Sequence, residues 1–156
     1  MNARTNSLAE RTNNWLASQL ELIWSTYFAD VPRVNPVTIN FGKKARARLG
    51  SIRQKQGKTT ITLTGHFRSS VIPENVVAET IAHELVHYTH GFESPLPKLY
   101  RYPHEGRIVQ AELESRGLAT NHRAARLWLK TNWLKIVGPP TRRRGRQLRR
   151  RFVLFR

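Results

Sequence analysis

One stretch, from Pro73 to Gly91, constrains the fold of this 156-residue chain more than any other. Proline and glutamate are favourable in the first turn of a helix, and Pro73 is followed by Glu74. Glycine is typical just after the last turn, where Gly91 stands. Between these ends, apolar side chains recur at helical spacing, at Val77, Ile81, Leu85 and Tyr88. The pattern predicts one helix over residues 73–90 that packs against a hydrophobic core.

The same helix carries the motif His-Glu-x-x-His, which begins at His83 and ends at His87. Residues four apart lie on one face of a helix, about 6 Å apart along its axis, so both imidazoles can bind one ion. Glu84 stands beside His83 and would reach a water at the ion rather than the ion itself. We predict one Zn²⁺ bound by His83 and His87, with Glu84 as the general base. The alternatives are a surface helix that happens to carry these residues and a metal site without activity.

A catalytic zinc site usually has three protein ligands and one open position. His90 lies about 10 Å along the helix axis from His83, which is too far for both to bind one ion. Glu93 has the spacing of the third ligand in the longer motif H-E-x-x-H-x-x-G-x-x-H, but His90 replaces the glycine of that motif. We predict His104, at the entrance of the next helix, as the third ligand, and Glu105 or Glu112 as the alternative.

The rest of the chain predicts an α+β fold around this helix. Apolar residues at three- and four-residue steps predict a leading helix over residues 6–29. Alternating and β-branched segments predict strands, with a hairpin turn at QKQGK, over 37–41, 45–53 and 59–64. Two further helices are expected, one ending near Gly117 and one capped by Asn121 and ending at the GPP sequence. We therefore expect an α+β domain with a small three-stranded antiparallel sheet.

Positive charge dominates the composition. The chain has 27 Lys and Arg against 10 Asp and Glu, which gives a net charge of +17, and its last sixteen residues contain eight arginines and no acid. A field of this sign attracts polyanions, of which nucleic acid is the commonest in a cytoplasm. We predict a domain over residues 1–140 and a disordered nucleic-acid-binding tail over 141–156. The predicted phosphate contacts of the tail are Arg142, Arg143, Arg144, Arg146, Arg149, Arg150 and Arg151.

The chain contains no cysteine, which excludes a disulfide framework, a thiolate zinc ribbon and a cysteine nucleophile. No stretch approaches the roughly 18 consecutive apolar residues that span a bilayer. The first residues also lack the apolar core of a signal peptide. We therefore expect a cytoplasmic protein without a membrane partner, associated with the nucleoid if the source is bacterial.

The order of the elements and the motif together resemble the SprT/Spartan-like zinc metalloprotease domain over roughly residues 8–117. The similar features are a leading helix, a strand with RARLGSI, the helix PENVVAETIAHELVHYTHG, the sequence HEG and a closing LESRGL. In that family two motif histidines and a downstream histidine bind zinc, and the motif glutamate is the catalytic acid and base. The resemblance implies these roles for His83, His87, His104 and Glu84, and it implies a zincin-like minimal metalloprotease domain. The better-known members are DNA-dependent proteases that degrade proteins covalently trapped on DNA.

Two features depart from the family pattern. The downstream histidine is usually followed directly by glycine, with an aromatic residue shortly after, whereas Glu105 follows His104 here and Ile108 takes the approximate place of the aromatic. The cysteine-rich zinc ribbon that follows the domain in many bacterial members is replaced by the arginine-rich tail. Any contact with DNA must therefore use other residues.

Two functional hypotheses follow. The first is a zinc endopeptidase that acts on DNA-associated proteins, including DNA–protein crosslinks. The second is a basic nucleic-acid-binding protein whose metal site is structural or vestigial. A metal-dependent nuclease fits less well, because the chain lacks a carboxylate cluster for magnesium.

Two segments near the motif carry further predictions. The strand TTITLT, if it forms the sheet edge beside the motif helix, could bind an extended substrate by strand addition; otherwise it completes the sheet. The connection after the motif interleaves Phe92, Tyr100 and Tyr102 with Lys98 and Arg101, a pattern that suits single-stranded DNA. We expect these aromatic rings instead to pack over the zinc site.

Overall fold

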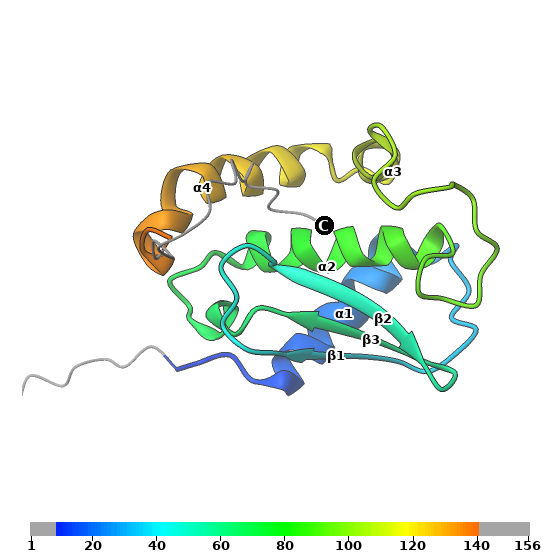
Figure 1. The fold of residues 1–156 in the computed structure, drawn as a ribbon, viewed down its shortest axis with the longest axis horizontal. Helices are drawn as coiled ribbons and strands as arrows, with labels where there is room; N and C mark the ends of the chain where they lie inside the picture. The colour runs from blue at the N-terminus through cyan, green and yellow to red at the C-terminus, as the bar shows by residue number, and fades with distance from the viewer. Residues whose placement is uncertain (1–8, 141–156) are drawn as a thin grey trace, which may run out of the picture.

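The computed structural model describes residues 9–140 and shows an α+β fold (Figure 1). Over these residues it contains four α-helices, three strands and one short 3₁₀ helix. The helices are α1 (Asn13–Tyr27), α2 (Glu74–Thr89), α3 (Ile108–Ser115) and α4 (Ala119–Val137), with the 3₁₀ helix η1 at Gly65–Arg68. The strands are β1 (Val37–Phe41), β2 (Gly50–Lys55) and β3 (Lys58–Leu63). The predicted class is therefore confirmed at the level of α+β.

The sheet is mixed, with the order β1-β3-β2, so the prediction of a fully antiparallel sheet is wrong. β2 and β3 form the expected antiparallel hairpin, but β1 pairs in parallel with β3. The chain passes from β1 to the far edge of the sheet before β3 fills the centre. Parallel neighbours need such a crossover, and alternation within a strand carries no information on the direction of its partner.

The second strand begins five residues later than the pattern of Ala45, Ala47 and Leu49 predicts. Ala45 instead forms two hydrogen bonds with the hydroxyl of Thr64, at 2.9 Å through its N–H and 2.9 Å through its carbonyl. The hairpin turn is confirmed, because Gln56 and Gly57 have positive φ angles of 50° and 74°, as a two-residue hairpin loop requires.

Helix α1 begins at Asn13, where the side chain of Thr12 accepts a hydrogen bond from the N–H of Trp15. Residues 9–12 are not helical, so the start predicted near residue 6 is wrong over these four residues, about one turn, while residues 6–8 lie outside the described part of the chain. The buried face of α1 packs on the sheet and on α2 through Leu16, Leu20, Ile23 and Trp24.

Helix α2 lies at the centre of the described domain. The sheet and α1 cover one side of it, and α3 and α4 cover another (Figure 1). Twelve of its sixteen residues are buried, so α2 is not the one-sided amphipathic helix that the sequence predicts. His83, Glu84 and His87 are among these buried residues. Polar side chains in such an interior need partners, or a ligand, to offset their lost hydration.

The end of α2 returns the chain toward the motif. Gly91 has a φ of 78°, its N–H donates to the carbonyl of Tyr88, and the N–H of Phe92 donates to the carbonyl of His87 at 2.9 Å. These two bonds form a Schellman motif, so the predicted stop at Gly91 is confirmed. The N–H of Leu99 then donates to the carbonyl of His90 at 3.0 Å, which holds the following loop against the helix end.

The last two helices differ from prediction mainly at their starts. α3 begins at Ile108, so His104 lies in the loop before it rather than at its entrance. α4 begins at Ala119, and Asn121 lies inside it, with its side-chain amide donating to the carbonyl of Asn75 at 3.4 Å. The predicted stop at the GPP sequence is confirmed, since Gly138 is the C-cap.

The arginine-rich tail over 141–156 lies outside the described residues, so its disorder and the domain boundary at 140 stay predictions. Within residues 9–140, none of the helices is both long enough and apolar enough to cross a membrane.

Candidate metal centre

Three imidazoles converge beside the middle of α2. The Nε2 atom of His83 lies 3.1 Å from Nε2 of His87 and 3.2 Å from Nε2 of His104. Two nitrogen ligands at about 2.0–2.1 Å from one tetrahedral zinc ion stand about 3.3–3.4 Å apart. The observed separations are close to that value, so these residues fit one zinc ion. They are also the only His, Asp or Glu group within residues 9–140 that could hold a metal.

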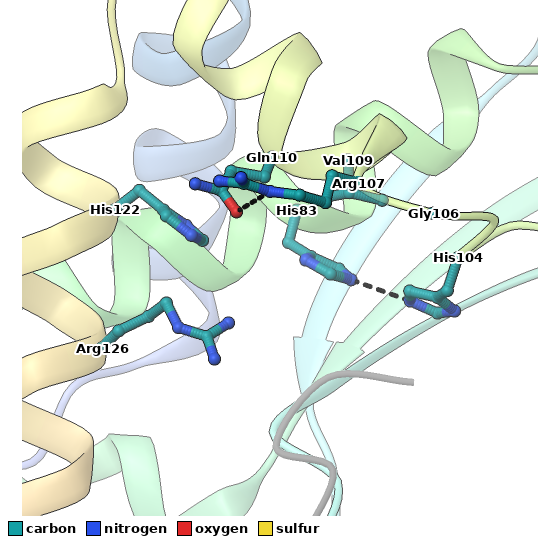
Figure 2. A pocket seen from close by; sticks show the side chains of 8 residues that line it. All are labelled: His83, His104, Gly106, Arg107, Val109, Gln110, His122 and Arg126. Atoms are coloured by element: carbon teal, nitrogen blue, oxygen red, sulfur yellow. Dashed lines mark hydrogen bonds between the residues drawn. The ribbon is translucent and has the colours of Figure 1, made fainter.

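The positions of the three histidines follow from two elements. His83 and His87 are one turn apart on α2, and the turn at Gly91 begins the loop that contains His104. The ring of His104 points toward that of His83 (Figure 2). The sequence-based choice of His104 as the third member agrees with this geometry. Glu105, the first alternative, is exposed and is not part of the group.

The other candidate ligands are engaged elsewhere. His90 is fully buried at the C-cap of α2, and its Nε2 lies 3.3 Å from Oε2 of Glu112. Glu112 also accepts a hydrogen bond from Arg116 at 2.8 Å, so its carboxylate is paired with His90 and Arg116 and not with the three-histidine cluster. The carboxylate of Glu93 accepts a hydrogen bond from the N–H of Gln54 at 2.6 Å. The three-histidine set is thus the one that the described structure brings together.

Burial keeps the two α2 histidines in the neutral form that binds metals. Burial is the main cause of the low pKa of both residues, and the neighbouring histidines lower it further. The pKa of His87 falls to about 3, and that of His83 lies well below its usual value. The Nδ1 atom of His87 is buried and has no hydrogen-bond partner among the described residues, unlike the usual outer shell of a metal-bound histidine.

Glu84 lies beside the cluster in a cavity of about 250 Å³. Only 2% of its surface is exposed, and burial raises its pKa from 4.5 to about 8, against the opposing effect of the Arg48 guanidinium. His87 and His104 line the same cavity. A carboxyl group with this pKa, at a cavity shared with two histidines of the cluster, can both accept and return a proton near neutral pH.

Gly50 allows strand β2 to approach Glu84. A Cβ atom at this position would lie 2.6 Å from Oε1 of Glu84 and 2.8 Å from Cγ2 of Thr80. Real side chains do not approach this closely, so only glycine leaves the Glu84 carboxylate in its place. The glycine is visible in the sequence RARLGSI, but its role could not be predicted, because the contact between Gly50 and Glu84 joins elements far apart in the sequence.

Strand β2, not β3, forms the sheet edge beside the cavity, which Ser51 and Ile52 line. Of the two alternatives for TTITLT, the structure supports the second, since β3 is central and completes the sheet. The N–H of Thr64 donates to the carbonyl of Leu49 at 2.8 Å, so by antiparallel alternation the backbone groups of residues 50, 52 and 54 point away from β3. The N–H of Gln54 already donates to the carboxylate of Glu93, so this end of the β2 edge is not open to a further strand.

Of the three loop aromatics, Phe92 packs edge-on against His87 and lines the cavity with Glu84, as predicted, whereas Tyr100 and Tyr102 are more exposed than predicted. Tyr102 is 56% exposed and Tyr100 is 39% exposed, so they do not form a covered layer over the histidines. The ring of Tyr100 packs edge-on against His90, and the guanidinium of Arg101 lies 5.3 Å from the ring centre of Tyr102.

One buried pair was missed by sequence reasoning. Glu79 on α2 is fully buried, and its Oε1 pairs with Nδ1 of His122 on α4. His122 also lines a second cavity, of about 180 Å³, which reaches His83 and His104 (Figure 2). No spacing along the chain joins positions 79 and 122, because their contact arises from the packing of α4 on α2.

Comparison with protein families, with curated proteins and with solved structures finds no match to this chain. The geometry of the metal centre therefore carries the functional argument. The seven predicted DNA-contacting arginines of the tail lie outside the described residues.

Proposed function

We propose that this protein is a zinc-dependent endopeptidase in which Glu84 is the general base. The observation that carries the proposal is the convergence of three Nε2 atoms within hydrogen-bond distance, next to a buried carboxyl group and an open cavity. His104 is exposed, so the cluster is open to an incoming substrate. An open position is typical of catalytic zinc sites, whereas structural sites are closed by four protein ligands.

His83, His87 and His104 would hold the metal. Imidazole nitrogen suits zinc, copper, iron and nickel, and the motif on a helix favours zinc among them. Zinc bound there would supply a Lewis acid that polarises a peptide carbonyl and makes water more acidic.

Glu84 would carry the proton transfers. Its carboxylate accepts a proton from the attacking water, and the resulting carboxylic acid gives that proton to the departing amine as the C–N bond breaks. The pKa of about 8 belongs to the metal-free site, and the positive charge of a bound zinc ion would lower it toward neutral pH, where the group can both accept and release a proton. The carboxyl group returns to its starting state after each cleavage.

The edge of β2 would bind the peptide backbone. Ser51 and Ile52 line the cavity that contains Glu84, and the N–H and carbonyl groups of residues 50 and 52 point away from β3, so an extended peptide could pair with them as an added strand. Such binding relies on main-chain atoms and places few demands on the substrate sequence. That suits a protease whose substrates are selected by where it is recruited.

We further propose that the substrates are DNA-associated proteins, including DNA–protein crosslinks. Support comes from the net charge of +17 and from the resemblance to SprT/Spartan-like proteases. The exposed ring of Tyr102 and the guanidinium stacked on it add a surface on which bases could stack beside the metal centre.

Digestion of a DNA-binding protein tests this function. Full-length protein and substrate are incubated with and without DNA, and with and without a zinc chelator. Cleavage that needs zinc and is stimulated by DNA is the expected result. Cleavage that the chelator stops but DNA does not affect would support the zinc peptidase and contradict the proposal that its substrates are DNA-associated proteins. No cleavage, with unfolding on chelation, would favour a nucleic-acid-binding protein with a structural metal.

A further inference from the structure

Two separate cavities open onto the histidine cluster. The larger one contains Glu84 and borders His87, while the smaller one borders His83, and His104 lines both. A peptide that lies along β2 and crosses the cluster would therefore reach the smaller cavity with a neighbouring side chain. The proposed function uses the larger cavity and leaves the smaller one unassigned.

The wall of the smaller cavity is basic. Arg107, from the loop before α3, and Arg126, from α4, both line it (Figure 2). Its described lining residues include no Asp or Glu. The pKa of His83 is lowered mainly by burial, then by the neighbouring histidines, and least by the positive charge of Arg126. That charge is therefore within electrostatic reach of the cluster.

Hydrogen bonds position the side chains of this wall. The Nε–H of Arg107 donates to Oε1 of Gln110 at 3.1 Å, and both residues line the cavity. His122 is held through Nδ1 by the buried carboxylate of Glu79. This wall is thus built from the loop before α3, from α3 and from α4, and a buried pair between α4 and α2 fixes His122 in it.

We propose that this cavity is a substrate subsite that accepts an acidic side chain, Asp or Glu, next to the scissile bond. The proposal rests on the proposed endopeptidase function and adds a specificity to it. Charge-assisted hydrogen bonds from guanidinium groups to a carboxylate are among the stronger ones in proteins, and arginine is well shaped to make them.

The size of the cavity favours a side chain over a nucleotide. Its volume of about 180 Å³ holds roughly six water molecules at about 30 Å³ each, enough for the side chain of Asp or Glu. Typical pockets for larger ligands begin at about 300 Å³. The cavity also borders two candidate metal ligands, His83 and His104, which is where a side chain of the peptide being cut would lie.

A cleavage-site profile tests the proposal. Zinc-loaded full-length protein digests a mixed peptide library, and the residues on both sides of each cut are identified by mass spectrometry. Wild type should show Asp and Glu enriched roughly tenfold at one position beside the cut. Arg126→Glu should lose this preference and gain one for Lys or Arg at the same position. Arg123→Glu is the matched control, because Arg123 is an exposed residue of α4 that does not line the cavity.

An unchanged profile in Arg126→Glu, from a wild type that cleaves, would overturn the subsite and leave the endopeptidase intact. If wild type cleaves nothing, the proposed function fails, and peptide binding still tests the cavity. In that case Glu84→Gln protein should bind a fluorescent Asp-containing peptide roughly tenfold more tightly than its Asn counterpart, and Arg126→Glu should abolish the difference. Loss of oligonucleotide binding in Arg126→Glu, with peptide binding unchanged, would assign the cavity to nucleic acid and refute the proposal.

Discussion

At the scale of single residues, the metal centre depends on side chains that are neutral because they are buried. Each imidazole of α2 gives up hydration in the interior, and a shared zinc ion would compensate that loss. A metal bound only by the folded chain stabilises it by mass action. Metal affinity and fold stability should therefore change together when a ligand is removed.

Replacing any one of the three histidines should release the metal. His83→Ala, His87→Ala and His104→Ala each remove one of three ligands, so we expect zinc affinity to fall by more than about 100-fold. Zinc content per chain after dialysis against a chelator measures this. His66→Asn is the control, because His66 packs against Trp133 away from the cluster. Wild-type zinc content in His104→Ala would exclude it as a ligand.

The zinc-free chain offers a pH test of Glu84. Burial raises its pKa from 4.5 to about 8, so between these values the unfolded chain releases a proton that the folded chain keeps. The free energy of unfolding should fall as pH rises through this window and level off above it. Glu84→Gln has no such proton, so its stability relative to chelated wild type should increase by roughly 3–6 kcal/mol from acid to alkaline pH. Urea unfolding at several pH values measures the difference, and a constant difference would contradict the raised pKa.

How well the sequence predicts each residue of the centre depends on the sequence distance between that residue and its contacts. His83, Glu84 and His87 follow from helix periodicity alone, so the sequence predicts their arrangement. His104 was predicted but could not be separated from Glu105 or Glu112, because the choice depends on the path of a loop. Arg126 and His122 could not be predicted from the sequence, because only the packing of α4 on α2 brings them to the centre.

At the scale of elements, the approach of β2 to α2 determines where Glu84 points. Gly50 makes this approach possible, and Gly50→Ala would place a Cβ atom 2.6 Å from Oε1 of Glu84. We expect the carboxylate to move, the rate of cleavage to fall by tenfold or more, and the zinc content to stay at the wild-type level.

Gly42→Ala is the matched control for this substitution. Its Cβ atom would lie 2.6 Å from Cγ2 of Thr62, so it introduces a similar overlap that does not involve Glu84. Both variants should lose roughly 1–3 kcal/mol of stability, but only Gly50→Ala should lose catalysis at temperatures where both stay folded. Equal turnover numbers in the two variants would show that Gly50 does not position Glu84.

The elements themselves were predicted unevenly. The β2–β3 hairpin and the end of α2 carry local turn signals, in QKQGK and Gly91, and both are confirmed. The position of β1 in the sheet has no local signal, because pairing with β3 is decided by the crossover between them. For the same reason, the sequence left open whether TTITLT forms the edge or completes the sheet, and the structure places it at the centre.

At the scale of the whole molecule, the proposed nucleic-acid-binding tail and the candidate metal centre lie in different parts of the chain. Residues 141–156 carry eight of the positive charges, and the three-histidine centre lies within 9–140. Deleting residues 141–156 should weaken DNA binding and reduce the slope of log K against log salt by about 0.7–0.9 for each phosphate that the tail neutralises. Binding titrations at several salt concentrations measure the slope. Peptide cleavage without DNA should be unaffected, and an unchanged slope would assign DNA binding to other residues.

The central claim is that Glu84 and the three histidines form one catalytic centre. The most direct measurement is the peptide cleavage rate of zinc-loaded Glu84→Gln against wild type, with zinc content determined on the same samples. We expect equal zinc in the two proteins and a rate lower by about 10²–10⁴-fold in the variant, because the site keeps its ligands and loses its base. A variant that holds the same zinc and cleaves at the wild-type rate would contradict the account.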